Sequence, residues 1–178
     1  MIEIEVKVGL DDPKRVERSL IAFGATPTGI EEQADTYYNA PDRDFGKTDE
    51  ALRIRGEDNE YYLTYKGPKL DKISKTRKEV EVSINDAYSM GEILSSLGFT
   101  PVRNVVKKRK KYRLGELVIS LDEVRELGSF MEVEFMAKDS HANDEKLESI
   151  FKFIEKLGIS RKSTIRESYL EMMLNNEK

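Results

Sequence analysis

Apolar and charged residues alternate without interruption from Ile2 to Val8. In a β-strand this alternation places the charged side chains on one face and the apolar side chains on the other. Glu3, Glu5 and Lys7 therefore share the charged face. An ordinary strand that is solvated on one face has the same pattern, so this segment alone predicts a strand but no function.

The Glu-x-Glu pair of this segment recurs twice, as Glu79-x-Glu81 and as Glu132-x-Glu134. After each copy comes a segment with apolar residues at helical spacing, at 12–24, 86–98 and 144–158. Each of these segments begins with Asp and ends at Gly, which are typical residues at helix boundaries. The recurrence indicates a weak internal repeat of a Glu-x-Glu strand, a helix and a returning strand.

Further alternating segments complete a set of eight predicted strands. Most connections between them are short or hairpin-like, which favours an antiparallel sheet, and eight strands can close into a barrel that holds one small ligand. We therefore predict an α+β fold over residues 1–178, with an eight-stranded closed antiparallel β-barrel, or tunnel, and helices packed on its outside. The predicted strands are residues 2–8, 30–39, 50–56, 60–66, 75–84, 104–114, 116–123 and 129–137.

The apolar stripes of the helices need a surface to pack on, and the apolar faces of the strands supply it. We expect the helices to cover strand residues such as Ile4, Val80, Val82 and Val133. The charged faces of the strands then point into the barrel, where seven acidic and seven basic side chains would meet. Buried charges cost several kcal/mol each unless they are paired or hold an ion. A wet tunnel for a highly charged ligand explains this interior best.

The residue types in the tunnel match a metal–polyphosphate ligand. The forked donors of arginine suit phosphate oxygens, and clustered carboxylates suit a hard divalent cation such as Mg²⁺ or Mn²⁺. The acidic residues are Glu3, Glu5, Glu79, Glu81, Asp122, Glu132 and Glu134, and the basic residues are Lys7, Arg53, Arg55, Lys66, Arg77, Lys107 and Arg109.

Composition excludes several other classes of protein. The chain has no cysteine, which removes disulfides, thiolate metal sites and cysteine nucleophiles. The only histidine, His141, lies in a polar stretch that we expect to be a surface loop, which argues against histidine catalysis or zinc binding. We expect no membrane span, no secretory signal and a cytoplasmic location. The net charge of −4 and the division of residues 107–111 between two strand faces argue against a nucleic-acid partner.

Taken together, the motifs resemble those of the CYTH superfamily over about residues 1–170. That superfamily unites class IV adenylyl cyclases and thiamine triphosphatases, and its members form triphosphate tunnel metalloenzymes. In length and in the residues of its motifs, the chain is most similar to the small class IV adenylyl cyclase branch. The motifs are Glu3-x-Glu5-x-Lys7, Gln33-x-Asp35-x-Tyr37-Tyr38, residues 51–55, residues 63–68, Arg77-x-Glu79-x-Glu81, Lys107-x-Arg109-x-x-Tyr112, and Asp122 ahead of Glu132-x-Glu134.

The resemblance implies roles for the tunnel residues. Glu79 and Glu81 would either hold a second metal ion or orient Arg53 and Arg55. No residue is assigned as the general base. The implied metal ligands are Glu3, Glu5, Asp122, Glu132 and Glu134, and the implied triphosphate contacts are Lys7, Arg53, Arg55, Lys66, Arg77, Lys107 and Arg109.

Three functions stay open at this point. With a ribose 3′-hydroxyl as the nucleophile, the protein is an adenylyl cyclase that converts ATP to cyclic AMP and pyrophosphate, and this is the activity that the resemblance favours. With water as the nucleophile, it is a triphosphatase acting on tripolyphosphate, thiamine triphosphate or a nucleoside triphosphate. A polyphosphate- or nucleotide-binding module without turnover is the third interpretation, and the intact Glu-x-Glu pairs argue against it.

Two peripheral segments complete the predictions. Ile165, Tyr169, Met172 and Met173 form an apolar stripe on the C-terminal tail, which we expect to be exposed and which could serve a homodimer. Gly67–Pro68 opens a Lys-rich loop that we expect to reach about Lys75.

Overall fold

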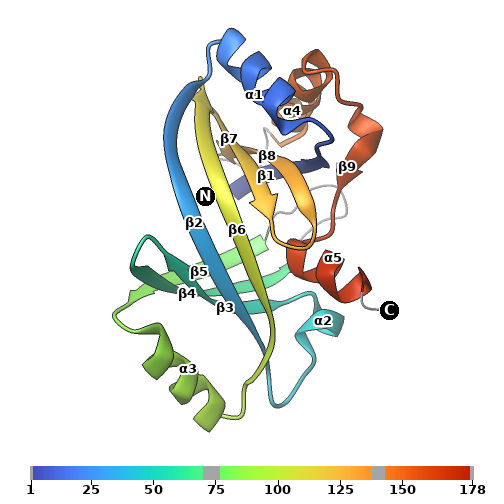
Figure 1. The fold of residues 1–178 in the computed structure, drawn as a ribbon. Helices are drawn as coiled ribbons and strands as arrows, with labels where there is room; N and C mark the ends of the chain where they lie inside the picture. The colour runs from blue at the N-terminus through green and yellow to red at the C-terminus, as the bar shows by residue number, and fades with distance from the viewer. Residues whose placement is uncertain (1, 70–76, 138–142, 177–178) are drawn as a thin grey trace.

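Nine strands form an antiparallel sheet in the computed structural model of the chain (Figure 1). The structure describes residues 2–69, 77–137 and 143–176, and the side chains of residues 4–69, 77–135 and 145–176. The strand order is β5-β4-β3-β2-β6-β7-β8-β1-β9. The strands are β1 (Ile2–Gly9), β2 (Thr26–Asn39), β3 (Ala51–Glu57), β4 (Glu60–Lys69), β5 (Arg77–Ile84), β6 (Thr100–Leu114), β7 (Leu117–Val124), β8 (Gly128–Ala137) and β9 (Thr164–Ile165).

Three of the helices occur in the segments for which Asp and Gly residues predicted helix ends. Asp12 accepts a hydrogen bond from the backbone N–H of Arg15 at 2.9 Å, and Asp86 accepts one from Ser89 at 2.8 Å. Within the described residues, no helix is both long and apolar enough to cross a membrane. The helices are α1 (Pro13–Ala22), α2 (Phe45–Thr48), α3 (Ala87–Ser96), α4 (Asn143–Lys156) and α5 (Tyr169–Asn176), with a 3₁₀ turn at Arg161–Ser163.

The predicted fold class is confirmed, with all eight expected strands and one more, β9. Two strands begin earlier than predicted, β2 at Thr26 and β6 at Thr100. The predicted Lys-rich loop begins later, because β4 continues through Gly67 to Lys69. The rest of that loop, and His141, lie outside the described residues.

The two ends of the sheet are linked by the C-terminal segment, and pairing between described residues does not join β5 to β9. The ammonium group of Lys7 on β1 donates to the backbone carbonyl of Glu167. Four residues later, Glu171 Oε1 lies 3.8 Å from the Nζ atom of Lys69 on β4. Figure 1 shows α5 between the β7–β8 part of the sheet and the β3–β4 part. The segment at residues 167–171 therefore bridges the two halves of the molecule.

Helices cover the outer, apolar face of the sheet on both halves. On one half, Leu20 of α1 and Ile154 of α4 pack in a core with Ile4 and Val133 of β1 and β8. On the other half, Leu94 of α3 packs in a second core with β3. The first core confirms the prediction that helices cover Ile4 and Val133.

Two predictions about apolar surfaces are wrong. Val80 and Val82 of β5 are 49% and 51% exposed, because β5 is the last strand of the sheet and the core under α3 forms with the neighbouring strands. The tail stripe is not an exposed surface, since Tyr169 and Met173 are buried against Phe130. In the tail, helical periodicity identified the apolar face, but it does not tell which surface will cover that face.

Candidate functional site

The inward faces of β6, β7 and β8 form a buried ionic cluster. The Nε and Nη2 atoms of Arg109 donate to the two carboxylate oxygens of Asp122 at 2.7 and 2.6 Å, and Nη2 also donates to Glu132. Lys107 Nζ lies 3.7 Å from Asp122. Burial opposes the charge of Arg109, but its partners Asp122 and Glu132 outweigh burial and hold its pKa above the ordinary value. The alternation along each strand brings these side chains together because they all lie on one face of neighbouring strands.

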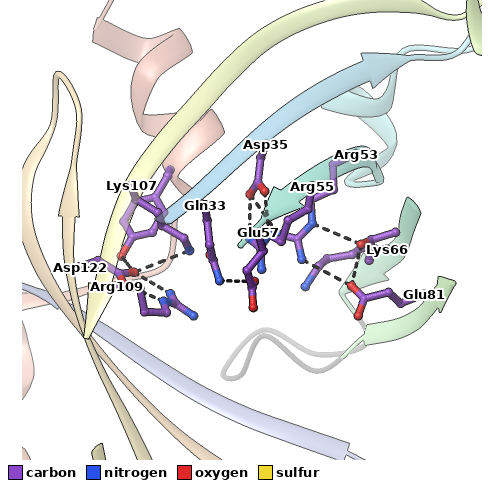
Figure 2. A network of polar contacts seen from close by, with 12 residues as sticks. Gln33, Asp35, Arg53, Arg55, Glu57, Lys66, Glu81, Lys107, Arg109 and Asp122 are labelled. Carbon is purple, nitrogen blue, oxygen red and sulfur yellow. Dashed lines mark hydrogen bonds and ion pairs between the residues drawn. The ribbon is translucent and has the colours of Figure 1, made fainter. Parts of the chain in front are cut away.

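A second cluster lies on β2, β3 and β4, opposite the first across the view in Figure 2. Asp35 accepts two hydrogen bonds of 2.7 Å from Arg55 and one of 3.3 Å from Arg53. Burial acts to raise the pKa of Asp35, but the hydrogen bonds from Arg55 and the charge of Arg53 outweigh it and leave the pKa below the ordinary value. The two arginines are therefore held side by side by one buried carboxylate, to which the sequence assigned no role.

Contacts at the outer strands involve more exposed side chains. Lys66 Nζ donates to Glu79 at 2.8 Å, and Glu81 accepts a 2.7 Å hydrogen bond from Thr64 while lying 3.9 Å from Arg53. Glu79 and Glu81 are themselves exposed. The structure thus places Glu81 near Arg53, and it places Glu79 beside Lys66. Arg77 begins β5, opposite Lys69 of β4.

Three carboxylates converge where β1 meets β8. Oxygen atoms of Glu5, Glu132 and Glu134 all lie within 4.8 Å of one another. Three carboxylates this close repel each other, and a hard divalent cation such as Mg²⁺ or Mn²⁺ would relieve the repulsion with its preferred oxygen ligands. These residues therefore fit the predicted metal site. Within the described side chains Asp122 is not part of the group, and the side chain of Glu3 lies outside that description.

Gln33 lies between the two ionic clusters in Figure 2. Its amide nitrogen donates to Glu57 at 2.7 Å and to Glu31 at 2.8 Å. Among the described residues, the buried Oε1 atom of Gln33 and the buried Oγ atom of Ser120 have no hydrogen-bond partner. A buried polar atom without a partner costs about 1–3 kcal/mol, and a bound water molecule or ligand at these positions would remove that cost.

The sequence also missed Tyr169, which the structure brings into contact with the tunnel residues. Its ring faces the ammonium groups of Lys7 and Lys107, and its hydroxyl bonds to Asp122. Burial and the nearby charge of Arg109 lower the pKa of Lys107 to about 8. One sequence signal pointed to the helix, because Ser168 and Glu171 match the pattern of a capping box.

Comparison with known proteins shows similarity along nearly the whole chain. The family model described as "CYTH domain" matches residues 1–169. The chain is 45% identical over 172 residues to "Putative adenylate cyclase MJ0240" of Methanocaldococcus jannaschii, covering 97% of this chain and 98% of that protein. The solved structure of PH1819 protein from Pyrococcus horikoshii OT3 has a TM-score of 0.89 and 40% identity, covering 98% of this chain and 99% of that one. PH1012 protein from the same organism gives a TM-score of 0.84 and 29% identity, with coverage of 95% and 98%.

Proposed function

Because the chain belongs to the CYTH domain family, we propose that it is a metal-dependent enzyme that acts on a triphosphate, and that it converts ATP to cyclic AMP and pyrophosphate. The observation that carries the proposal is the convergence of Glu5, Glu132 and Glu134 within 4.8 Å. Arg109 contacts two of these carboxylates. Its Nη2 atom pairs with Glu132, and its Nη1 atom lies 4.0 Å from Glu134. The name of the 45% identical relative supports the choice of cyclase activity.

The basic residues of the two clusters would bind the phosphate oxygens. Arg53 and Arg55, held together by Asp35, offer forked donors that suit neighbouring oxygens of a phosphate chain. Lys107 and Arg109 offer positive charge from the facing cluster. Binding to several phosphate groups at once would hold the triphosphate in one orientation, with the attacking and leaving oxygens in line.

Glu5, Glu132 and Glu134 would hold Mg²⁺ or Mn²⁺. When bound, such an ion supplies positive charge that neutralises the triphosphate and the leaving oxygen. The carboxylates lie next to Arg109, so ion and arginine would share the charge of the same ligand. A module that only binds polyphosphate has no need of three converging carboxylates, which argues against the non-catalytic interpretation.

Triphosphate hydrolysis is the second candidate activity. The residues proposed for binding are ionic groups that would contact phosphate oxygens or a metal ion, and such groups hold tripolyphosphate as well as they hold ATP. The difference between cyclase and triphosphatase therefore lies in the nucleophile, which is a ribose 3′-hydroxyl in one case and water in the other.

Product analysis separates these activities. The protein is incubated with ATP, tripolyphosphate or thiamine triphosphate, each with Mg²⁺ and with Mn²⁺, and chelator-treated samples serve as controls. We expect cyclic AMP and pyrophosphate from ATP. Orthophosphate release would select the triphosphatase, and binding without any product would select the non-catalytic module. Equal activity in the chelated samples would overturn the assignment of a metal-dependent enzyme.

A further inference from the structure

Tyr169 contacts predicted triphosphate-site residues on three different strands. Its hydroxyl donates a 2.7 Å hydrogen bond to Asp122 on β7. Its ring centre lies 4.3 Å from the Nζ atom of Lys7 on β1 and 5.2 Å from that of Lys107 on β6. The side chain is only 7% exposed, although it belongs to the last helix of the chain.

The position of this ring is strongly constrained. Ser168 and Glu171 form the capping box that begins α5, with the Glu171 carboxylate accepting from the Ser168 N–H at 2.6 Å and the Ser168 hydroxyl accepting from the Glu171 N–H at 3.2 Å. Tyr169 is therefore held in the first turn of the helix. Its ring packs at 5.1 Å from the ring of Phe130, tilted by 58°. A side chain fixed in this way can set the positions of the groups that touch it.

The contacts of Tyr169 suit the charges around it. The face of an aromatic ring attracts cations, so one ring can hold two ammonium groups that would otherwise repel each other. The hydroxyl donates to Asp122, and the same carboxylate holds Arg109 through two hydrogen bonds. The preceding turn adds a contact, because Lys7 also donates to the Glu167 carbonyl. The side chain thus acts on Lys7 and Lys107 directly and on Arg109 through Asp122.

We propose that Tyr169 is a positioning residue of the triphosphate site, which holds Lys7, Lys107 and, through Asp122, Arg109 in the arrangement that binds the phosphate chain. The identity of the ligand rests on the proposed function given above. The sequence had placed Tyr169 on an exposed stripe for a homodimer, whereas the structure directs it toward the basic residues of the tunnel. The competing explanation is that Tyr169 only fills the core under α5.

Three variants separate positioning from packing. Tyr169→Met keeps an apolar side chain of adaptable shape but removes both the ring and the hydroxyl. Tyr169→Phe keeps the ring and removes only the hydroxyl. Met173→Ala is the matched control. Met173 is buried in the same cluster, so shortening its side chain would disturb the packing of α5 alone. Calorimetry with tripolyphosphate and Mg²⁺ gives the Kd of each protein, thermal unfolding gives its Tm, and steady-state kinetics with the best substrate give KM and kcat.

We expect Tyr169→Met to raise Kd and KM by about tenfold and Tyr169→Phe by about threefold, with kcat changed by less than about twofold. Met173→Ala should lower Tm and leave Kd within about twofold of wild type. If Met173→Ala weakens binding as much as Tyr169→Met, or if neither Tyr169 variant changes Kd, the proposal is overturned.

The remaining outcomes are also decisive. If Tyr169→Met does not fold, the result for Tyr169→Phe decides. An unchanged Kd in Tyr169→Phe would show that the hydroxyl has no role, and the proposal would be overturned. If wild-type protein does not bind tripolyphosphate, the proposed function fails and takes this inference with it. Wild-type binding combined with unaffected variants would instead remove the positioning role and leave the proposed function standing.

Discussion

The two ends of the sheet carry the same alternating pattern but have different surroundings. At the β1–β8 end, Ile4 lies under the helices at 0% exposure, and Lys7 on the opposite face is 1% exposed. At the β5 end, Val82 is half exposed on the outer face and Glu81 is exposed on the inner face. The first end is covered on both faces, whereas the second is an edge strand that solvent reaches from both sides.

This difference shows that the three Glu-x-Glu copies are not equivalent. The first and third copies lie on paired strands and share a group of converging carboxylates. The second copy lies alone on β5, where Glu79 and Glu81 each contact a separate partner. Charges interact more strongly where water is excluded, and exposed pairs contribute about 0–1 kcal/mol. Substitutions at the two ends should therefore differ in effect, even where the residue types are the same.

The largest difference is expected for the carboxylates. Glu134→Ala should lower metal-dependent turnover on the order of 1,000-fold, because it removes one of three converging ligands. The protein without metal should be at least as stable as wild type, since one crowded negative charge is lost. Turnover of ATP and tripolyphosphate at several Mg²⁺ concentrations, with urea denaturation of the metal-free protein, measures both effects.

Glu79→Ala is the matched control at the exposed end. It removes a carboxylate from the same motif, and turnover should stay within about threefold of wild type because the Lys66–Glu79 pair is solvated. Unchanged turnover in Glu134→Ala would refute the metal-site assignment. Equal losses in the two variants would refute the difference between the two ends.

The apolar faces should show the next largest difference. Ile4→Ala should lower the free energy of unfolding by about 2–5 kcal/mol, because it leaves a cavity in a closed core. Val82→Ala should lower it by at most about 1 kcal/mol, since the side chain is already half exposed. Urea denaturation of both variants tests this comparison, and similar losses would show that β5 is covered in solution.

A smaller effect is expected from the buried charge of Lys107. Burial lowers the pKa of Lys107 to about 8 in the folded protein, from its ordinary value of 10.5. Between these two values the unfolded chain binds more protons than the folded one. The free energy of unfolding should therefore rise with pH in this window, by at most roughly 3 kcal/mol from this group. Other groups also titrate there, so the measured quantity is the difference between wild type and Lys107→Met.

Urea denaturation at about pH 7 and about pH 10 gives this difference. Lys107→Met has no proton to lose at this position, so its stability relative to wild type should be higher at the lower pH than at the higher pH. A difference that is the same at both pH values would show that Lys107 titrates normally, and that the cluster around Asp122 does not exclude water.

Much of the fold followed from local patterns. Alternation predicted the eight long strands, and Asp12, Asp86 and the glycines at positions 24 and 98 predicted helix ends that the structure contains. The strand β9 was missed, because two residues are too few for a periodic signal. The cover of β5 was predicted wrongly, because the position of a strand within a sheet is decided by pairing over long distances in the sequence.

The candidate site could be predicted as a set of residues but not as a set of contacts. Period-two spacing identified which side chains share a face. It did not show that Asp35 would hold two arginines or that Asp122 would hold Arg109 instead of joining the described carboxylate group. Those pairings depend on which strands become neighbours and in which register.

The sequence alone determined which residues form strands and helices and which side chains lie on the charged faces, because these properties repeat over a few neighbouring residues. Only the tertiary structure decided which charges meet, how exposed each one is, and that Tyr169 from the end of the chain reaches Lys7 near its beginning. The physical reason is that burial and ion pairing depend on contacts between segments far apart in the chain, and local periodicity carries no information about those contacts.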